Sequence, residues 1–107
     1  MKVLIDNKKI NLIYANKFKI RLFGLMGKKN IEEGIIFPHC NSIHTFFMRE
    51  EIDVLLLDKD LSIKYLYPAL KKNKIIFKRG IKYIIELPQN TINQYQIKQN
   101  SKIKIIE

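Results

Sequence analysis

Short apolar segments alternate with turn-forming residues along most of the chain, and this alternation is its clearest structural signal. Segments of this length, rich in Ile, Leu, Phe and Tyr, are typical of β-strands and too short for ordinary helices. The pattern therefore predicts a series of short strands. The predicted strands cover residues 2–5, 10–14, 35–37, 42–48, 52–57, 61–67, 75–77, 83–87 and 102–106.

The residues between and within these segments indicate how the strands are arranged. Asp6 and Asn7 favour a tight turn, so the first two strands are predicted to form a β-hairpin. The run 52–57 is apolar on both faces, which is typical of a central strand. Residues 58–60 have turn chemistry and are expected to connect that strand to its partner at 61–67.

Two segments have helical rather than strand character. After Ala15 the apolar residues recur at helical spacing, and we expect a helix of about two to three turns that Asn16 caps and Gly27 ends. Residues 91–97 are predicted to form one short helical turn. Many short strands with one or two short helices predict an α+β fold. The sheet is expected to be mainly antiparallel and strongly curved, or a small barrel, in a single domain spanning residues 1–107.

The charge balance adds a possible class of partner. The chain carries 20 Lys and Arg against 10 Asp and Glu, a formal net charge of +10. Such a small basic protein could bind nucleic acid. Only three of the cations are Arg, however, and Lys, Ile and Asn all have AT-rich codons, so genome composition alone could produce the excess. If there is a nucleic-acid surface, it is expected in the basic region that contains Lys71, Lys72, Lys74, Lys78 and Arg79.

Cysteine content and hydropathy bear on the compartment. A single Cys allows no internal disulfide, which fits a reducing environment. No apolar run approaches the roughly 20 residues that a transmembrane helix needs. The apolar start of the chain meets Asp6 too early for a signal peptide. The expectation is a soluble cytoplasmic protein without a membrane span.

An ordered set of short motifs resembles the domain-of-unknown-function 192 family. The set begins at Arg21 with Arg-Leu-Phe-Gly-Leu-Met-Gly, which is similar to the family's Arg-x-x-Gly-Leu-Met segment. It continues through residues 34–37, 42–49, 52–54 and 57–58 to Glu-Leu-Pro at 86–88, so it covers nearly the whole chain from about Ala15. The resemblance implies a compact β-rich fold. It implies no established activity and assigns no catalytic residue.

The chain departs from the family pattern at three places. Glu50-Glu51 stands where relatives often carry Phe-Pro, which changes the charge beside the most polar segment and weakens the case for a shared ligand. Asn90 replaces a late Gly, and Asn100-Ser101 replaces a Gly-Asp pair. Asn tolerates a left-handed backbone, so the last two are expected to be turn substitutions.

The densest group of polar side chains lies between Cys40 and Asp53. The predicted site is a polar patch of His44, Thr45, Arg49 and Asp53, with Asn41 and Cys40 adjacent. In one interpretation Asp53 accepts hydrogen bonds from backbone or Arg and fixes the entry of a strand. In the other, His44 and Arg49 are donors in a cleft for a small molecule or anion.

The same segment contains residues that metal or thiol chemistry would use. A zinc site requires three or four ligands, whereas the chain offers one Cys and two His. Cys40 and His44 share one side of a strand, but at about 13 Å apart they cannot form a nucleophile–base pair without a bend. A metal- or Cys40-dependent enzyme is therefore a second alternative. We expect no catalytic residue, metal or cofactor, and a non-catalytic binding or structural module whose partner is a small ligand or a protein.

Overall fold

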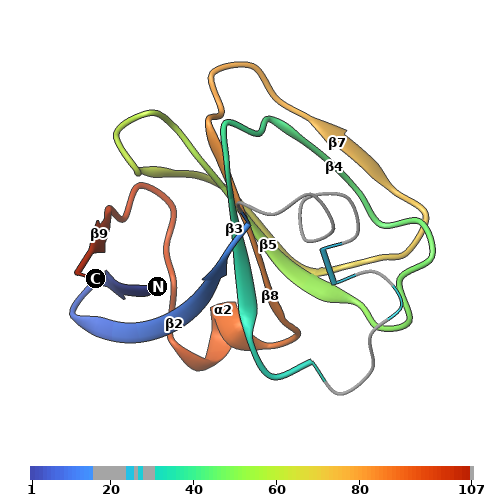
Figure 1. The fold of residues 1–107 in the computed structure, drawn as a ribbon, viewed down its shortest axis with the longest axis horizontal. Coiled ribbons are helices and arrows are strands. Elements are labelled where there is room, and N and C mark those ends of the chain that lie inside the picture. The colour runs from blue at the N-terminus through green and yellow to red at the C-terminus, as the bar shows by residue number, and fades with distance from the viewer. Residues whose placement is uncertain (16–23, 26, 28–30, 107) are drawn as a thin grey trace.

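Nine strands and one short helix make up the described part of the chain. The computed structural model describes residues 1–15, 24, 25, 27 and 31–106 (Figure 1). The elements are β1 (Lys2–Ile5), β2 (Lys8–Tyr14), β3 (Gly34–Pro38), β4 (Ser42–His44), β5 (Ile52–Leu57), β6 (Ile63–Leu70), β7 (Ile75–Phe77), β8 (Tyr83–Pro88), α2 (Thr91–Gln94) and β9 (Ile103–Ile105).

Seven of the strands form one strongly curled sheet. Its order is β6-β5-β8-β3-β2-β1-β9, and β4 and β7 form a separate two-stranded ribbon. All pairs are antiparallel except β2 with β3, which run parallel. The result is a mostly β half-barrel with one short helix among the described residues. The expected fold class, with a mainly antiparallel and strongly curved sheet, is confirmed.

The first hairpin forms as the turn chemistry predicts. β1 and β2 pair antiparallel, with Ile5 opposite Lys8. The two residues between them, Asp6 and Asn7, have φ values of 50° and 69°. A two-residue turn with two left-handed residues matches the twist of the flanking strands, and Asp and Asn tolerate that backbone better than most residues.

The central strand β5 is buried on both faces, as its sequence predicts, because an apolar cluster covers each face. Leu55 and Leu57 face the cluster that β1, β9 and α2 close. Val54 and Leu56 face the opposite cluster. The ribbon covers part of this second cluster, with Ile43 of β4 and Ile76 of β7 packed against it.

Two predicted strands differ from the structure by three residues or more at one end. The segment 42–48 is a strand only as far as His44, because Thr45 and Met48 close a turn and Phe47 has a left-handed φ of 62°. The strand expected at 61–67 runs from Ile63 to Leu70. It starts late because Leu61, at φ 64°, still belongs to the preceding turn.

The helical predictions have separate outcomes. α2 confirms a short helix after Asn90, whose φ of 76° shows the left-handed backbone expected of a Gly replacement. Asn100 behaves likewise at φ 71°. Most of the helix predicted between Ala15 and Gly27 lies outside the described residues. Ala15 itself continues the sheet, since its N–H donates to the carbonyl of Ile36 at 2.9 Å.

Candidate functional site

Asp53 is buried, and its carboxylate binds backbone. Only 1% of the residue is exposed. Oδ1 accepts a hydrogen bond from the N–H of Ala69 and Oδ2 accepts one from the N–H of Ile92, both at 2.8 Å. These bonds join β5 to the far end of β6 and to the first turn of α2. The carboxylate therefore uses backbone partners, not the Arg49 guanidinium, as the structural interpretation of this residue expected.

Thr45 has a similar role beneath the ribbon. The residue is 1% exposed, and its hydroxyl donates to the carbonyl of Lys71 at 2.7 Å while accepting from the N–H of Lys74 at 2.8 Å. Its own N–H donates to the Lys74 carbonyl at 2.9 Å. Thr45 thus fixes the turn that leads into β7, and its polar atoms are fully used there.

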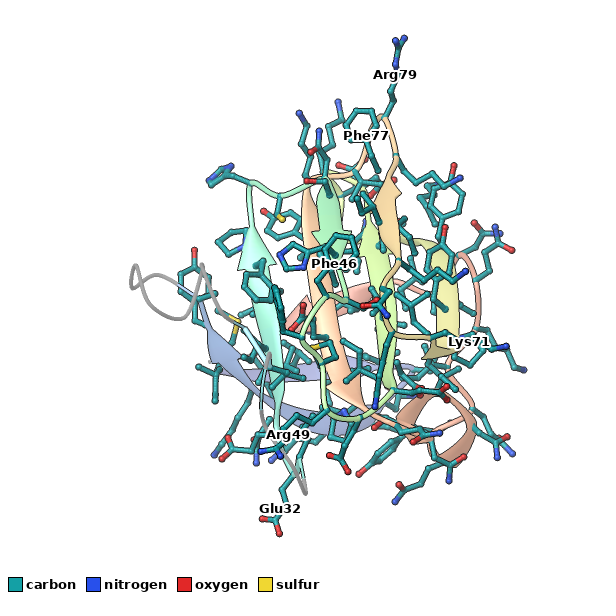
Figure 2. All side chains as sticks on the ribbon, turned by 90° about the vertical axis from the view of Figure 1, so that its right-hand side faces the viewer. Glu32, Phe46, Arg49, Lys71, Phe77 and Arg79 are labelled. Atoms are coloured by element: carbon teal, nitrogen blue, oxygen red, sulfur yellow. The ribbon has the colours of Figure 1, made fainter. Side chains whose placement is uncertain are left out.

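The other predicted site residues lie nearer the surface and do not gather in one patch. His44 is exposed on β4, where its ring stacks on Phe46 at a centroid distance of 5.4 Å. Arg49 is exposed and lies at the opposite end of the view from Phe77 (Figure 2). Asn41 is exposed at the start of the ribbon, and the half-buried Cys40 donates its thiol to the carbonyl of Ser42 at 3.3 Å. A role for these residues in ligand binding stays a prediction.

An exposed apolar surface lies on the outer side of the ribbon. Ser42 pairs with Phe77 and His44 with Ile75, and all four side chains face away from the core. Phe47 is 79% exposed, Ile75 70% and Phe77 57%. In Figure 2, Phe77 lies near the upper end of the molecule and Phe46 near its middle. We call the following six residues the ribbon face: Ser42, His44, Phe46, Phe47, Ile75 and Phe77.

Cations border the ribbon face at both ends of β7. Lys71, Lys72 and Lys74 precede the strand, and Lys78 and Arg79 follow it. All except the half-buried Lys78 are exposed. The Lys78 ammonium lies 5.1 Å from the centroid of the Tyr65 ring, a cation–π contact that anchors it on the inner side of the ribbon. No acidic residue occurs in the sequence between residues 61 and 85, so β7 and its bordering cations lie in a segment without carboxylates.

The sequence predicts strands at 42–48 and 75–77 but no exposed apolar face on them. The three apolar residues 75–77 cannot reveal it alone, because a strand can be buried on both faces, as β5 is. Because Ile76 faces the core, Ile75 and Phe77 face water.

Glu86 was also missed as a chemical group. It lies in the middle of β8, is 7% exposed, and accepts a hydrogen bond from the N–H of Leu25 at 3.2 Å. Burial raises the pKa of its carboxyl from 4.5 to about 7, and the Leu25 bond opposes that shift. A Cβ at Gly24 would lie 2.8 Å from Oε1 of Glu86, so the left-handed glycine permits this close approach. The sequence offered a signal for Glu86, because it is an acidic residue inside the otherwise apolar run 83–87.

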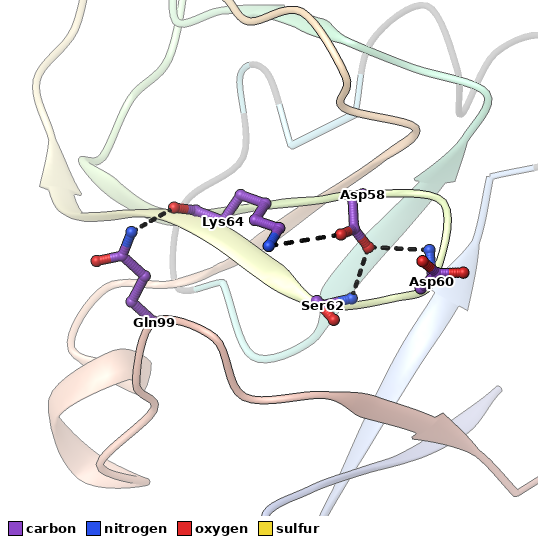
Figure 3. A network of polar contacts seen from close by, with 5 residues as sticks. All are labelled: Asp58, Asp60, Ser62, Lys64 and Gln99. Atoms are coloured by element: carbon purple, nitrogen blue, oxygen red, sulfur yellow. Dashed lines mark hydrogen bonds and ion pairs between the residues drawn. The ribbon is translucent and has the colours of Figure 1, made fainter.

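A shallow pocket of about 450 Å³ lies at the end of the sheet near Asp58 and Arg79. Three of its polar lining residues, Asp58, Lys64 and Gln99, have local partners, as Figure 3 shows. Asp58 accepts hydrogen bonds from the N–H groups of Asp60 and Ser62 at 2.9 and 3.0 Å, and its other oxygen lies 3.7 Å from the Lys64 ammonium. The Ser62 N–H is the largest cause that lowers the pKa of Asp58. These contacts organise the turn after β5.

Two further kinds of site are absent from the described residues. These residues contain no group of three or more His, Cys, Asp or Glu side chains arranged to hold a metal ion. Within the same part of the chain, no helix has the length and apolarity that crossing a membrane would require.

Comparison with known proteins places the chain among uncharacterised relatives. The UPF0127 protein TK1120 of Thermococcus kodakarensis is 33% identical over 95 residues, which are 83% of this chain and 60% of that protein. A UPF0127 protein of Thermococcus sibiricus is 36% identical over 85 residues, covering 74% of this chain and 55% of that protein. The chain therefore spans less than two thirds of the length of these relatives.

Two solved structures share the fold. A protein of unknown function from Novosphingobium aromaticivorans superposes with a TM-score of 0.83 at 14% identity, covering 98% of this chain and 84% of that one. A protein from Sinorhizobium meliloti, described as a candidate transcription regulator, gives 0.81 at 16% identity, covering 96% and 89%. A family model described as "Uncharacterized ACR, COG1430" matches residues 1–105. The chain belongs to this family, DUF192, as its ordered motifs indicated.

Proposed function

We propose that this chain is a non-catalytic binding module that holds a protein partner on the ribbon face. The observation that supports it best is the exposure of Ile75 and Phe77 on one face of β7, with Phe47 exposed in the turn that follows β4. Contiguous exposed apolar surface rimmed by polar residues is typical of interaction sites. Aromatic side chains supply much of the energy at such interfaces.

The residues predicted from sequence fit this proposal in two different roles. His44 belongs to the ribbon face and stacks on Phe46, so it is a candidate contact residue. Thr45 supports the surface from below, because its side chain holds the turn that leads into β7. Asp53 instead holds the far end of β6 and the first turn of α2. Arg49 lies away from β7 and is not part of the proposed surface.

A protein partner fits the ribbon face better than nucleic acid. Single-stranded nucleic acid stacks its bases on aromatic rings, and the ribbon face does carry Phe46, Phe47 and Phe77. The choice of a protein partner therefore depends on the cations that border it. Four of the five bordering cations are Lys, whereas recognition of phosphate by a planar fork favours Arg. The apolar centre with a basic rim instead fits a peptide that combines acidic and apolar residues.

Selection of random peptides tests this proposal. A displayed library of random dodecapeptides would be panned against the wild-type protein, and the enriched peptides titrated against two double variants. We expect Ile75→Ser/Phe77→Ser to weaken binding by about tenfold or more, since buried hot-spot contacts are lost. The matched control is Ile105→Ser/Ile106→Ser, which changes two exposed Ile near β9 and should leave affinity unchanged.

Three outcomes would overturn the proposal. Either no peptide is enriched, or the enriched peptides bind the Ile75→Ser/Phe77→Ser variant as tightly as the wild type. The third is measured with a fluorescent oligodeoxythymidine. Salt-sensitive binding of that probe, reduced in Lys72→Ala/Lys74→Ala, would replace the protein partner with single-stranded nucleic acid.

A further inference from the structure

The hydrogen-bond register of the ribbon leaves the outer edge of β7 open. The N–H of Thr45 donates to the Lys74 carbonyl, and the N–H of Lys78 donates to the Asn41 carbonyl. In an antiparallel pair, bonded and non-bonded residue pairs alternate. The N–H and C=O groups of Ile75 and Phe77 therefore point away from β4. Among the described residues, β4 is the only strand paired with β7.

The outer edge of β4 is less accessible than that of β7. The carbonyl of Ser42 already accepts the Cys40 thiol. Beyond the strand, the N–H of Gly27 donates to the carbonyl of Phe47 at 3.2 Å, so Gly27 lies beside the turn that follows β4. β7 is consequently the edge of the ribbon that another strand can reach.

The side chains of β7 divide into two kinds, one on each face. Ile75 and Phe77 are apolar and exposed on the ribbon face. On the opposite face, Lys74 and Lys78 lie on either side of Ile76, which packs against the core. A strand added beside β7 would bring every second side chain next to Ile75 and Phe77. The intervening side chains would lie next to Lys74 and Lys78.

We propose that β7 accepts an extended acidic peptide as a third strand of the ribbon, an inference that rests on the proposed function. The free backbone groups of Ile75 and Phe77 bind the peptide backbone, as in other cases of strand addition. The complementary sequence is acid, β-branched, any residue, β-branched, acid. Its carboxylates pair with Lys74 and Lys78, and its β-branched side chains cover Ile75 and Phe77.

A second copy of this chain fits the same edge poorly. Antiparallel pairing of two β7 strands about Ile76 would place Lys74 of one copy opposite Lys78 of the other, twice. Like charges directly opposite one another destabilise a strand pair. Lysines at an exposed strand edge are a known protection against pairing with identical chains. The same charges attract an acidic partner.

A short synthetic peptide tests strand addition directly. The probe is fluorescent, blocked at both ends, and has the sequence Ser-Glu-Val-Thr-Val-Glu-Ser. In antiparallel pairing with β7, the N–H groups of both Val residues face β7, whereas those of Thr and the second Glu face outward. N-methylation of both Val residues should weaken binding by about tenfold or more. The control peptide carries the two N-methyl groups on Thr and the second Glu, and its affinity should change by less than about twofold.

A charge exchange tests the second half of the inference. Lys74→Glu/Lys78→Glu should weaken binding of the acidic probe by about tenfold or more. The probe in which both Glu are replaced by Lys should bind this variant and not the wild type. That rescue would not occur if the substitutions merely disturbed the fold.

The outcomes separate this inference from the proposed function. If peptides selected by panning require Ile75 and Phe77, but both N-methylated probes bind equally well, the ribbon face is a binding surface and strand addition is wrong. Strand addition is also wrong if the acidic probe does not bind while panned peptides do. If neither the probe nor any panned peptide depends on Ile75 and Phe77, both proposals fail.

Discussion

The central strands and the ribbon differ in which side chains they bury: polar ones are buried in the first, and apolar ones are exposed in the second. In β5 and β8, Asp53 and Glu86 are buried in apolar surroundings and bind backbone N–H groups. In the ribbon, Ile75 and Phe77 are exposed to water. Buried polar residues thus hold the framework together. The apolar residues, which resemble core in the sequence, form the surface that is available to a partner. The following predictions test this division, beginning with the largest expected effect on stability.

Asp53→Ala should be the most destabilising of these changes. It removes the acceptor of two buried hydrogen bonds and leaves the N–H groups of Ala69 and Ile92 without their partner. We expect the free energy of unfolding to fall by about 3–5 kcal/mol, measured by urea denaturation. Arg49→Ala is the matched control because its side chain is exposed, and it should change stability by less than about 0.5 kcal/mol. Equal effects of the two substitutions would show that Asp53 depends on Arg49 after all.

Glu86→Gln should change the pH dependence of stability. Because burial raises the pKa of Glu86 from 4.5 to about 7, the folded protein binds this proton more tightly than the unfolded chain. The stability that the protonated carboxyl contributes is fully present below pH about 4.5 and is lost as the pH rises through about 7. The wild type should lose about 3 kcal/mol relative to Glu86→Gln over that range. Parallel stability curves for the two proteins between pH 4.5 and 8 would contradict the pKa assignment.

Ile75→Ser/Phe77→Ser should have the smallest effect on folding. Both side chains are mostly in water, so their replacement should change the free energy of unfolding by less than about 0.5 kcal/mol. Ile76→Ser is the informative comparison, because Ile76 packs against the core. This substitution should lower the free energy of unfolding by at least about 1 kcal/mol. A large loss of stability in the double variant would mean that the ribbon face is part of the core.

Local features of the fold were predictable from sequence, whereas partnerships across the sheet were not. The turn at Asp6 and Asn7 and the doubly buried run of β5 depend on neighbouring residues or on side-chain alternation, both of which are visible in a sequence. The partners of Asp53 lie 16 and 39 residues away, at Ala69 and Ile92. Nothing in the spacing of residues indicates that these backbone groups converge on one carboxylate.

The candidate surface was unpredictable for a related reason. Whether Phe47 or Ile75 is buried depends on which element covers it, and that is a property of the whole fold. The expected strand 42–48 would have placed Phe47 in a sheet. In the structure a turn begins at Thr45, and the Phe47 side chain is exposed to solvent. The basic region from Lys71 to Arg79 was identified from sequence, and the structure adds the apolar surface that it borders.

The pairing of β1 with β9 has a consequence for the order of events during synthesis. The β1–β2 hairpin is made before the other described strands, but the strand that covers its other edge is residues 103–105. A nascent chain on the ribosome can close the hairpin early and must then wait until β9 has been made before that edge is covered. An uncovered edge on a growing chain is a place where neighbouring nascent chains can associate wrongly.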